Sequence, residues 1–405
     1  MSAHAEQTSK AVSVRAVGAA HEIAADTWNA LANPSRSEAS DEWDYNPFLA
    51  HAFFDAVERS GSATRRTGWM PHHLLMERDG EAVGLLPCYV KSHSQGEYVF
   101  DYGWADAFER AGGDYYPKLQ CSVPFTPATG RRLLVGNGDD RLERQALLGE
   151  GLRQVCEELG VSSAHITFQR TDEAKLLEAM GYLERNDQQY HWHNLSPDGD
   201  PYASFDDFLG SLASRKRKAI RKERAEALQN VTIERLTGAD LTDEVWDTFF
   251  RFYMDTGSRK WGRPYLTRDF YTRIGATMAD DVLLVMARSK EHGRYVAGAI
   301  NFVGSHTLFG RHWGCTEHHP MLHFEVCYYQ AIDYAIEHGL RTVEAGAQGS
   351  HKLARGYMPT ITHSTHHITH PQLRQAVASY LAREREAVAY EAEVTERHGP
   401  FRKSG

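Results

Sequence analysis

Apolar and polar positions follow the same order in two parts of the chain. Residues 73–92 (HLLMERDGEAVGLLPCYVKS) and 282–304 (VLLVMARSKEHGRYVAGAINFVG) are each two apolar runs joined by a charged turn that contains glycine. Each pair is followed by a helical pattern that ends at glycine and leads into another apolar run, at 147–168 and at 324–349. This order predicts two copies of one unit made of helix, hairpin, helix and strand. Ligand sites tend to lie at the interface between two such units.

The segment 194–201 (NLSPDGDP) is polar and carries two prolines, which is typical of a linker. We therefore predict a first domain over residues 20–193 and a second over 202–405. In the first domain the patterns predict, in order, a helix over 46–61, the hairpin at 73–92, a strand that starts at 97, a helix over 141–159 and a strand over 163–169. In the second they predict a helix over 214–228, a strand over 230–236, helices over 243–254 and 267–277, strands over 282–288, 295–303 and 306–313, a helix over 322–338, a strand over 341–346 and a long C-terminal helix over 371–398.

Residues 103–130 are rich in glycine, proline, tyrosine and tryptophan and have little periodicity. We expect a long connection there, and a connection of this length inside a domain is more often functional than idle. The expected fold class is α/β, with a mixed sheet flanked by helices in each domain.

Composition narrows the class of protein. The chain has 405 residues, a 41% apolar fraction, 24% charged residues and a net charge of −9. These values fit two globular domains and give no support for a general nucleic-acid binder, although a local basic patch is compatible with them. Five scattered cysteines without a CxxC motif favour reduced thiols. We see no signal peptide and no membrane span, so we expect a cytoplasmic protein.

Several long and unusual motifs carry a family resemblance. The stretches DYGWAD, YYPKLQCSVPFTP, TGSRKWGRPYLT, LHFEVCYYQAIDYAIEHGL and VEAGAQGSHKLARGYMP resemble the FemAB-like group of bacterial-type N-acyltransferases, within the GNAT (acetyltransferase-like) superfamily. The resemblance covers roughly residues 40–375. It implies a tandem pair of GNAT-type domains and the transfer of an acyl or aminoacyl group to an amine. It also implies that Glu344, Gln348 and Lys352 contribute to the acyl-transfer site.

The segment 340–359 is the sharpest local signal. It predicts a strand that leads into a glycine-rich turn, where Gly346 and Gly349 let the backbone approach a ligand closely. Lys352 and Arg355 follow, as partners for a phosphate or carboxylate, with His351 beside them. The alternative is a tight turn with solvated charges. The segment is not a P-loop, since no Ser or Thr follows the lysine.

The donor stays open between two classes. Acetyltransferases with a Q/R-x-x-G-x-G/A loop hold the CoA pyrophosphate there, but this chain has RHWGCTEHHPMLHFE in that position, with one glycine. This departure puts acetyl-CoA in doubt, although a helix N-terminus near Pro320 would offer free N–H groups to a phosphate. FemX-type relatives use aminoacyl-tRNA instead. We expect no tightly bound cofactor, with acyl-CoA or aminoacyl-tRNA as co-substrate.

The helix predicted over 322–338 begins with two candidate catalytic residues. His323 and Glu325 lie near its N-terminus, where the helix dipole favours a carboxylate. Glu325 is a candidate general base or a structural cap, and Cys327 fits a buried structural thiol better than a nucleophile. A set of eight histidines suggests a metal: His318, His319, His323, His351, His363, His366, His367 and His370. They form no HExxH motif, however, and THSTHHITH alternates like a strand. We predict no metal site.

Aromatic and basic residues gather in loops, as they do in polar-ligand sites and equally in domain interfaces. The candidates for substrate binding are Asp101, Tyr102, Trp104, Tyr115, Tyr116 and Lys118 in the first domain and Arg259, Lys260, Trp261, Tyr265 and Arg311 in the second. Seven of the eleven residues from Ser214 to Arg224 are Lys or Arg, which fits a solvated helix or contact with the phosphates of a tRNA, nucleotide or CoA.

Acyl transfer to an amine needs a base, donors for the oxyanion and a proton source, and no covalent nucleophile. We therefore expect a two-domain N-acyltransferase that moves an acyl group from an acyl-CoA-like donor to a small-molecule amine. Glu344 or Glu325, with His323, would accept the proton, and Lys352 would stabilise the developing charge. The alternatives are an aminoacyl-tRNA-dependent FemX-type transferase and a non-catalytic scaffold of two GNAT-like domains.

Overall fold

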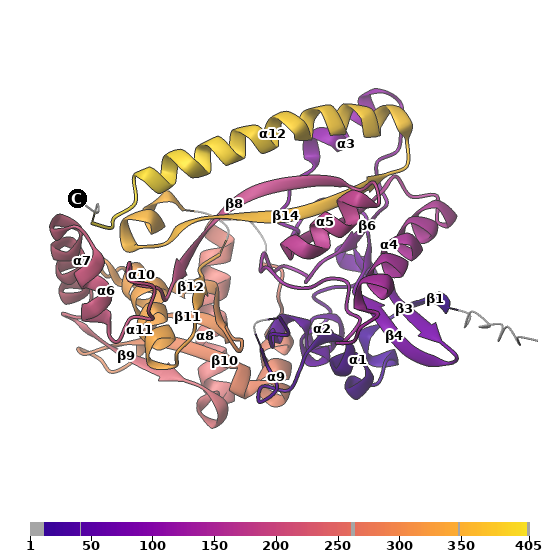
Figure 1. Ribbon diagram of the computed structural model, residues 1–405. Helices are drawn as coiled ribbons and strands as arrows, with labels where there is room; N and C mark the ends of the chain where they lie inside the picture. The colour runs from indigo at the N-terminus through magenta and orange to yellow at the C-terminus, as the bar shows by residue number, and fades with distance from the viewer. Residues whose placement is uncertain (1–11, 41, 261–263, 347–348, 403–405) are drawn as a thin grey trace, which may run out of the picture.

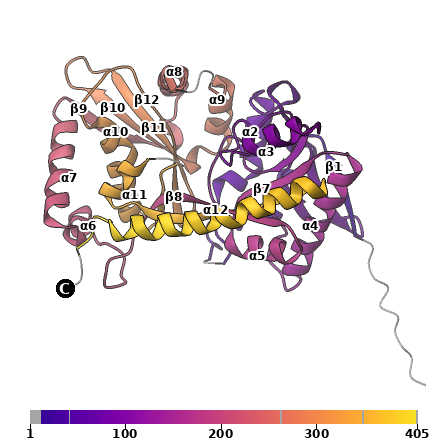
Figure 2. The same ribbon diagram turned by 90° about the horizontal axis from the view of Figure 1, so that it is seen from above.

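The computed structural model describes residues 12–40, 42–260, 264–346 and 349–402. It shows two α/β halves side by side, with one long helix that runs across both (Figure 1, Figure 2). The first half contains β1 (Val12–Val17), α1 (Ala25–Ala32), α2 (His51–Arg59), β2 (Trp69–Pro71), β3 (His73–Arg78), β4 (Glu81–Leu86), β5 (Tyr89–Lys91), α3 (Tyr102–Arg110), β6 (Lys118–Cys121), α4 (Arg141–Glu158), β7 (Ser163–Gln169), α5 (Thr171–Ala179) and β8 (Leu183–His193).

The second half contains α6 (Phe205–Ser211), α7 (Ser214–Ala227), β9 (Val231–Leu236), α8 (Asp243–Lys260), α9 (Arg268–Thr277), β10 (Val282–Ser289), β11 (Tyr295–Val303), β12 (Thr307–Cys315), α10 (Leu322–Phe324), the π-helical turn η6 (Glu325–Tyr329), α11 (Gln330–Glu337), β13 (Thr342–Glu344), the 3-10 helix η7 (Ser350–Arg355), β14 (Met358–Ile368) and α12 (Pro371–Arg397). Short 3-10 turns connect some elements: η1 (Ala20–Glu22), η2 (Pro47–Leu49), η3 (Arg65–Thr67), η4 (Gly238–Asp240) and η5 (Ala279–Asp281).

The order of elements repeats between the halves. Each has a strand, two helices, a hairpin, a third strand, a helix, a further strand, one more helical segment and a final strand of 11 residues, β8 or β14. In the first half α3 is added between the hairpin and the third strand. The predicted fold class, two mixed α/β units in tandem with a long C-terminal helix, is confirmed.

In the described part of the chain, an 11-stranded sheet has the order β2-β5-β6-β7-β14-β8-β13-β12-β11-β10-β9, and a 3-stranded sheet has the order β1-β3-β4. The hairpin of the first half belongs to both sheets. Its strands break at His72 and Cys88, where the His72 N–H donates to the Cys88 carbonyl over 2.8 Å. Beyond this break β2 and β5 pair in the large sheet, while β3 and β4 pair in the small one.

The final strands of the two halves are exchanged. β14, from the C-terminal end, lies between β7 and β8, and β8 lies between β14 and β13. The two long strands pair with each other in antiparallel register, from Met358 opposite His191 to His366 opposite Leu183. The chain thus returns to the first half after the second is built. The boundary at 194–201 stays a prediction.

A shared apolar core joins the halves. The rings of Phe48 and Phe302 are 4.7 Å apart, and those of Phe53 on α2 and Phe270 on α9 are 5.7 Å apart. Each buried phenylalanine contributes roughly 1.5–3 kcal/mol of transfer free energy. Helix α8 packs against β12, where a Cβ at Gly314 would meet the Phe252 carbonyl at 2.1 Å, so only glycine permits this approach.

Most predicted elements are confirmed within a few residues, including the strand over 163–169, the helix over 141–159 and the C-terminal helix. The strand predicted to start at 97 is wrong, because α3 begins at Tyr102 and no strand precedes it there. The stretch 103–130 holds most of α3 and all of β6 rather than one long connection. The helix over 322–338 is interrupted by the π-helical turn.

Candidate active site

β12 and β13 separate near the middle of the large sheet. They pair in parallel over three positions, which end with Phe309 opposite Glu344, after which β12 continues alone on that side to Cys315. The register between β11 and β12 shifts by one residue between Gly310 and Trp313, which places a β-bulge at Arg311 and His312. Bulges redirect side chains and are common next to active sites.

Glu344 is the last residue of β13 and is 8% exposed. Its Oε2 accepts a hydrogen bond from the Thr129 N–H of the first half over 3.3 Å. Burial raises the pKa of Glu344 to about 8, against the lowering effect of this hydrogen bond and of the Arg132 and Arg311 guanidinium groups. A carboxyl group with this pKa exchanges its proton near neutral pH, as general acid–base catalysis requires.

Lys352 lies in η7, after the glycine-rich turn, and is 1% exposed. Its Nζ donates to the Gly346 carbonyl over 2.6 Å. Burial, together with the nearby Arg311 guanidinium, lowers the pKa of Lys352 to about 7, against the raising effect of Cys327. Gly349 has φ 122°, a backbone conformation that favours glycine. The turn thus presents an amine that also titrates near neutral pH.

Arg311 lies at the meeting point of both halves. Its Nη2 donates to the Phe125 carbonyl over 2.6 Å, and its guanidinium carbon is 5.8 Å from the centre of the Tyr98 ring. Tyr265 stacks on Phe125 with ring centres 4.9 Å apart. The structure therefore brings together the predicted residues Arg311 and Tyr265 with aromatic residues of the first half.

His323 and His351 also lie close together, with ring centres 6.1 Å apart. The Tyr328 hydroxyl is hydrogen-bonded to His351 Nε2 over 2.9 Å, and Trp313 on β12 is 5.1 Å from the His323 ring. His323 is half-buried and His351 is exposed. These side chains line the N-terminal end of the helix that follows β12.

Two predicted residues are engaged by partners in their own chain. Arg355 donates to Glu223 over 2.8 Å and lies 3.4 Å from the Phe324 ring centre, so the carboxylate that it meets is internal. Glu325 is fully buried and accepts two hydrogen bonds from Arg224, at 2.9 and 3.0 Å. This pairing ties α7 to η6 and accounts for the burial of Glu325 without a catalytic role.

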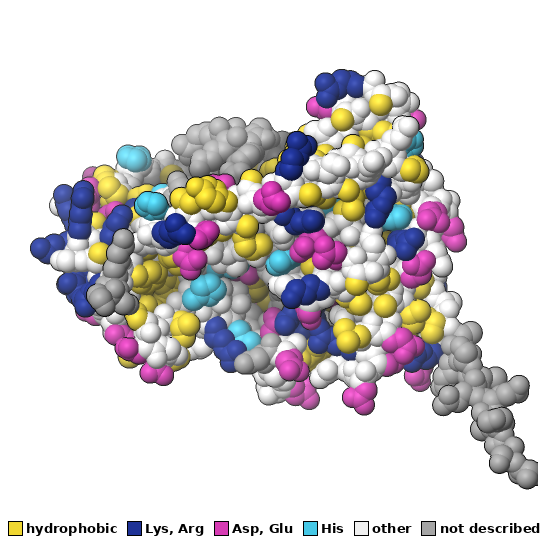
Figure 3. Space-filling model, turned by 45° about the horizontal axis from the view of Figure 1, so that its top comes forward, with side chains coloured by type: hydrophobic (Ala, Val, Ile, Leu, Met, Phe, Trp, Pro, Cys, Tyr) yellow, Lys and Arg dark blue, Asp and Glu magenta, His cyan; other side chains and the backbone are white. Residues whose placement is uncertain are grey.

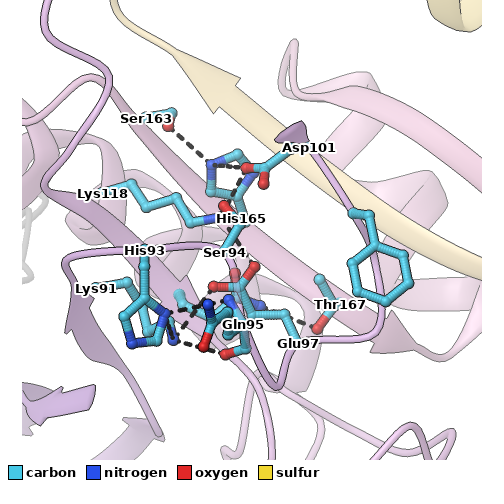
Figure 4. Close-up of polar contacts among 12 residues, drawn as sticks. Lys91, His93, Ser94, Gln95, Glu97, Asp101, Lys118, Ser163, His165 and Thr167 are labelled. Atoms are coloured by element: carbon cyan, nitrogen blue, oxygen red, sulfur yellow. Dashed lines mark hydrogen bonds and ion pairs between the residues drawn. The ribbon is translucent and has the colours of Figure 1, made fainter. Parts of the chain in front are cut away.

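The two charged residues predicted in the first half, Asp101 and Lys118, meet in one buried cluster of polar contacts (Figure 4). Lys118 on β6 donates to Asp101 Oδ2 over 2.6 Å, to Glu97 Oε2 over 2.9 Å and to Ser94 Oγ over 2.8 Å. Asp101 also accepts the Tyr115 hydroxyl over 2.6 Å. Burial would lower the pKa of Lys118, but the two carboxylates outweigh it and the pKa is raised.

Histidines complete this cluster on the β7 and β14 side. His165 Nδ1 is 2.7 Å from His366 Nδ1, and burial lowers the pKa of His165 to about 3. Trp104 packs edge-on to His366 at 4.9 Å, and the Tyr116 hydroxyl is 2.8 Å from Ser94 Oγ. Tyr102 differs, because it is exposed and stacks on Phe100.

The basic run forms α7 and divides into two sets of side chains. Arg224 faces inward, whereas Arg215, Lys218 and Lys222 are exposed and make no ion pair among the described residues. Lys and Arg side chains gather at the left end of the molecule in Figure 3, where Figure 1 places α7. These side chains form a positively charged surface on α7.

Some predicted residues have no structural account here. Gln348 and Trp261 lie outside the described residues, and the side chains of Arg259 and Lys260 are likewise not described. Among the residues that the structure describes, no group of three or more His, Cys, Asp or Glu side chains is arranged to hold a metal ion. No helix within the described ranges has the length and apolar character needed to cross a membrane.

Sequence reasoning did not identify several residues around Glu344. Thr129 and Arg132 come from the first half, and His191, which pairs with Glu344, comes from the exchanged strand β8. They lie far from residue 344 in the chain, and no local motif marks them. The packing of the two halves against each other, together with the pairing of β8 with β13, brings them to the site.

The large mixed sheet thus carries a buried titratable carboxyl group, Glu344, where β12 and β13 separate, and the buried amine of Lys352 follows in η7. A model of the FemAB-like family, described as peptidoglycan biosynthesis and recognition, matches residues 19–403, and the chain belongs to this family.

Solved structures with a similar chain path are distant in sequence. FemX is 15% identical, with a TM-score of 0.49 over 79% of this chain and 93% of that one. L-PGS from Bacillus licheniformis is 10% identical, with a TM-score of 0.48 over 84% and 98%. A tandem GNAT protein from the clavulanic acid biosynthesis pathway is 14% identical, with a TM-score of 0.44 over 89% and 99%. A search among curated proteins found no match.

Proposed function

We propose that this protein transfers an acyl group from an activated donor to an amine acceptor of peptidoglycan metabolism. The observation that carries the proposal is Glu344, a buried carboxyl group with a pKa near 8 at the point where β12 and β13 separate. The family description supports the peptidoglycan connection.

In the proposed reaction, ionised Glu344 takes a proton from the acceptor ammonium. The neutral amine then attacks the carbonyl carbon of the donor, and a C–N bond forms as the carbonyl becomes an oxyanion. Lys352 in its protonated form and Arg311 stabilise this negative charge. The oxyanion collapses, the bond to the leaving group breaks, and protonated Glu344 gives its proton to the leaving group. The nitrogen, positively charged since the attack, releases its extra proton to solvent, so the products are the neutral amide, the protonated leaving group and one proton.

The acyl donor is the finer part of the proposal. An acyl-CoA-like thioester is the first candidate. It would lie beside the turn around Gly349 and the start of the helix near His323. An aminoacyl-tRNA is the second candidate, and the exposed cations of α7 favour it because they match a phosphate backbone.

The test is a transfer assay with an acyl-CoA series and charged tRNA as donors and peptidoglycan precursor peptides as amine acceptors. We expect Glu344→Gln to lower kcat by at least about 100-fold, the usual scale for loss of a general base. Glu58→Gln, which changes a buried carboxylate of the first half that accepts the Ala20 N–H, is the matched control and should keep wild-type activity.

The pH dependence of kcat/KM gives a second readout. The reaction requires ionised Glu344 and protonated Lys352. The profile should therefore be bell-shaped, with apparent pKa values near 7 and 8 that describe the two residues as a coupled pair rather than either residue alone. Lys352→Arg keeps the positive charge at this position over the whole pH range. We therefore expect the fall of kcat/KM at high pH to disappear in this variant. Full activity of Glu344→Gln would refute the base, and no transfer from any donor would favour the scaffold alternative.

A further inference from the structure

The buried cluster of the first half connects β6 to one irregular segment. Ser94, Glu97 and Asp101, the three residues that Lys118 contacts, all belong to the stretch between β5 and α3. Lys91, at the end of β5, adds a hydrogen bond to the Gln95 carbonyl over 2.9 Å and an ion pair with Glu97 at 3.5 Å. Two lysines therefore fix the segment 94–101 at several points.

These contacts select one conformation of the segment 94–101, because a charge that is buried without a partner is costly. Lys118, Glu97 and Asp101 are each at most 2% exposed. Such a network holds one arrangement of its backbone, since any other leaves a buried charge unpaired. The cluster therefore acts as a rigid anchor for the segment.

Tyr98 lies in the middle of the anchored segment and has φ 62°, a conformation that is unusual for a residue other than glycine. Its ring reaches the second half, 5.8 Å from the Arg311 guanidinium, within the range of a cation–π contact. Arg311 in turn lies in the β-bulge beside Glu344 and interacts with it electrostatically.

We propose that Lys118 is a positioning residue for the second half: by anchoring segment 94–101 it holds Tyr98 against Arg311 and so keeps Arg311 beside Glu344. The inference rests on the proposed function for its effect on catalysis. Its structural part concerns Arg311 and Glu344 and stands independently of any reaction.

A titration of Glu344 tests the proposal without an activity assay. Carbon-13 NMR of protein labelled at the glutamate carboxyl group reports the ionisation of Glu344, with Glu344→Gln used to assign the signal. The groups that set this titration are Arg311, Arg132, Asp44 and the Thr129 N–H. Arg311 lowers the pKa of Glu344, so its release should raise that pKa.

We expect Lys118→Met and Tyr98→Leu each to raise the pKa of Glu344 by about one unit, within the range that a close opposite charge produces. One unit leaves roughly tenfold less ionised Glu344 below that pKa, so kcat at pH 7 should fall about tenfold. Tyr98→Phe keeps the ring but removes the hydroxyl, which is hydrogen-bonded to Arg311, so it should shift the titration in the same direction as Tyr98→Leu but by less.

Two matched controls separate positioning from general damage. Phe100→Leu removes another aromatic ring from the same segment, one that is 46% exposed, and Glu58→Gln alters a different buried polar cluster of the first half. Neither should move the titration. If Lys118→Met fails to fold, Tyr98→Leu decides alone, and an unchanged Glu344 titration in that variant overturns the proposal. A shifted titration together with full activity of Glu344→Gln would uphold the positioning and reject the catalytic role.

Discussion

Glu344 and Lys352, both in the segment 340–359, have pKa values far from those that are usual for their residue types. Glu344 retains its proton to about pH 8 and Lys352 loses its proton near pH 7, in both cases because the protein has removed water from a charge. The sequence identified both residues through the family resemblance. It did not predict their titration, because burial depends on Thr129, Arg132 and β8, which are distant in the chain.

The raised pKa of Glu344 has a consequence for stability. Its carboxyl group has a pKa of about 8 in the folded state and 4.5 as the ordinary value, so the folded state binds the extra proton between these limits. Its contribution to stability is therefore greatest below pH 4.5 and is lost as the pH rises through 8. We predict that Glu344→Gln is more stable than the wild type at pH 9, by on the order of 1–3 kcal/mol.

Thermal melting between pH 6 and pH 9 measures this effect. The difference in Tm between Glu344→Gln and the wild type should grow toward pH 9. Glu226→Gln, which changes an exposed glutamate of α7, should show the wild-type dependence. Parallel curves for all three proteins would contradict a raised pKa at Glu344.

Among the elements, α7 shows what a charge pattern predicts and what it omits. The sequence predicted the helix, but it could not separate the arginine that packs inward from the cations that face solvent. The inward residue is chosen by Glu325 and Asp333, over a hundred positions away. The same reason explains the missed strand β8, whose polar sequence LERNDQQYHWH reveals no apolar face until β13 and β14 pair with it.

We predict that Arg224→Ala and Lys222→Ala differ sharply in stability. Removal of Arg224 leaves Glu325 buried without its cation, which should cost about 2–4 kcal/mol of unfolding free energy. Lys222 is exposed, so its loss should change stability by at most about 0.5 kcal/mol. Urea unfolding followed by circular dichroism measures both, and equal midpoints would show that the buried ion pair is not important for the fold.

The whole molecule is held together in a way that hydrophobic patterns did not reveal. The repeat of elements was visible in the sequence, because each unit has its own periodicity. The exchange of β8 and β14 was not visible in the sequence, because it depends on which strands pair with each other. The sequence pattern of β8 or β14 would be equally compatible with pairing inside its own half.

We predict that the chain tolerates a cut within 194–201 when both pieces are present. Residues 1–197 and 198–405, produced together, should form a stable 1:1 complex, since β14 inserts between β7 and β8 and the Phe53–Phe270 contact joins the cores. Size-exclusion chromatography with light scattering tests this. Two pieces that are each monomeric and folded alone would contradict the exchange.

The inserted strand β14 also determines when the first half can complete its folding during biosynthesis. A ribosome delivers β7 and β8 first, and the strand that separates them, Met358–Ile368, follows only after the elements of the second half from α6 to η7. Until then both strands expose unpaired backbone edges, which attract other strands. The first half therefore cannot complete its part of the sheet until the second half has been translated as far as β14. A premature stop before residue 358 would disable the N-terminal half as well as the part that it removes.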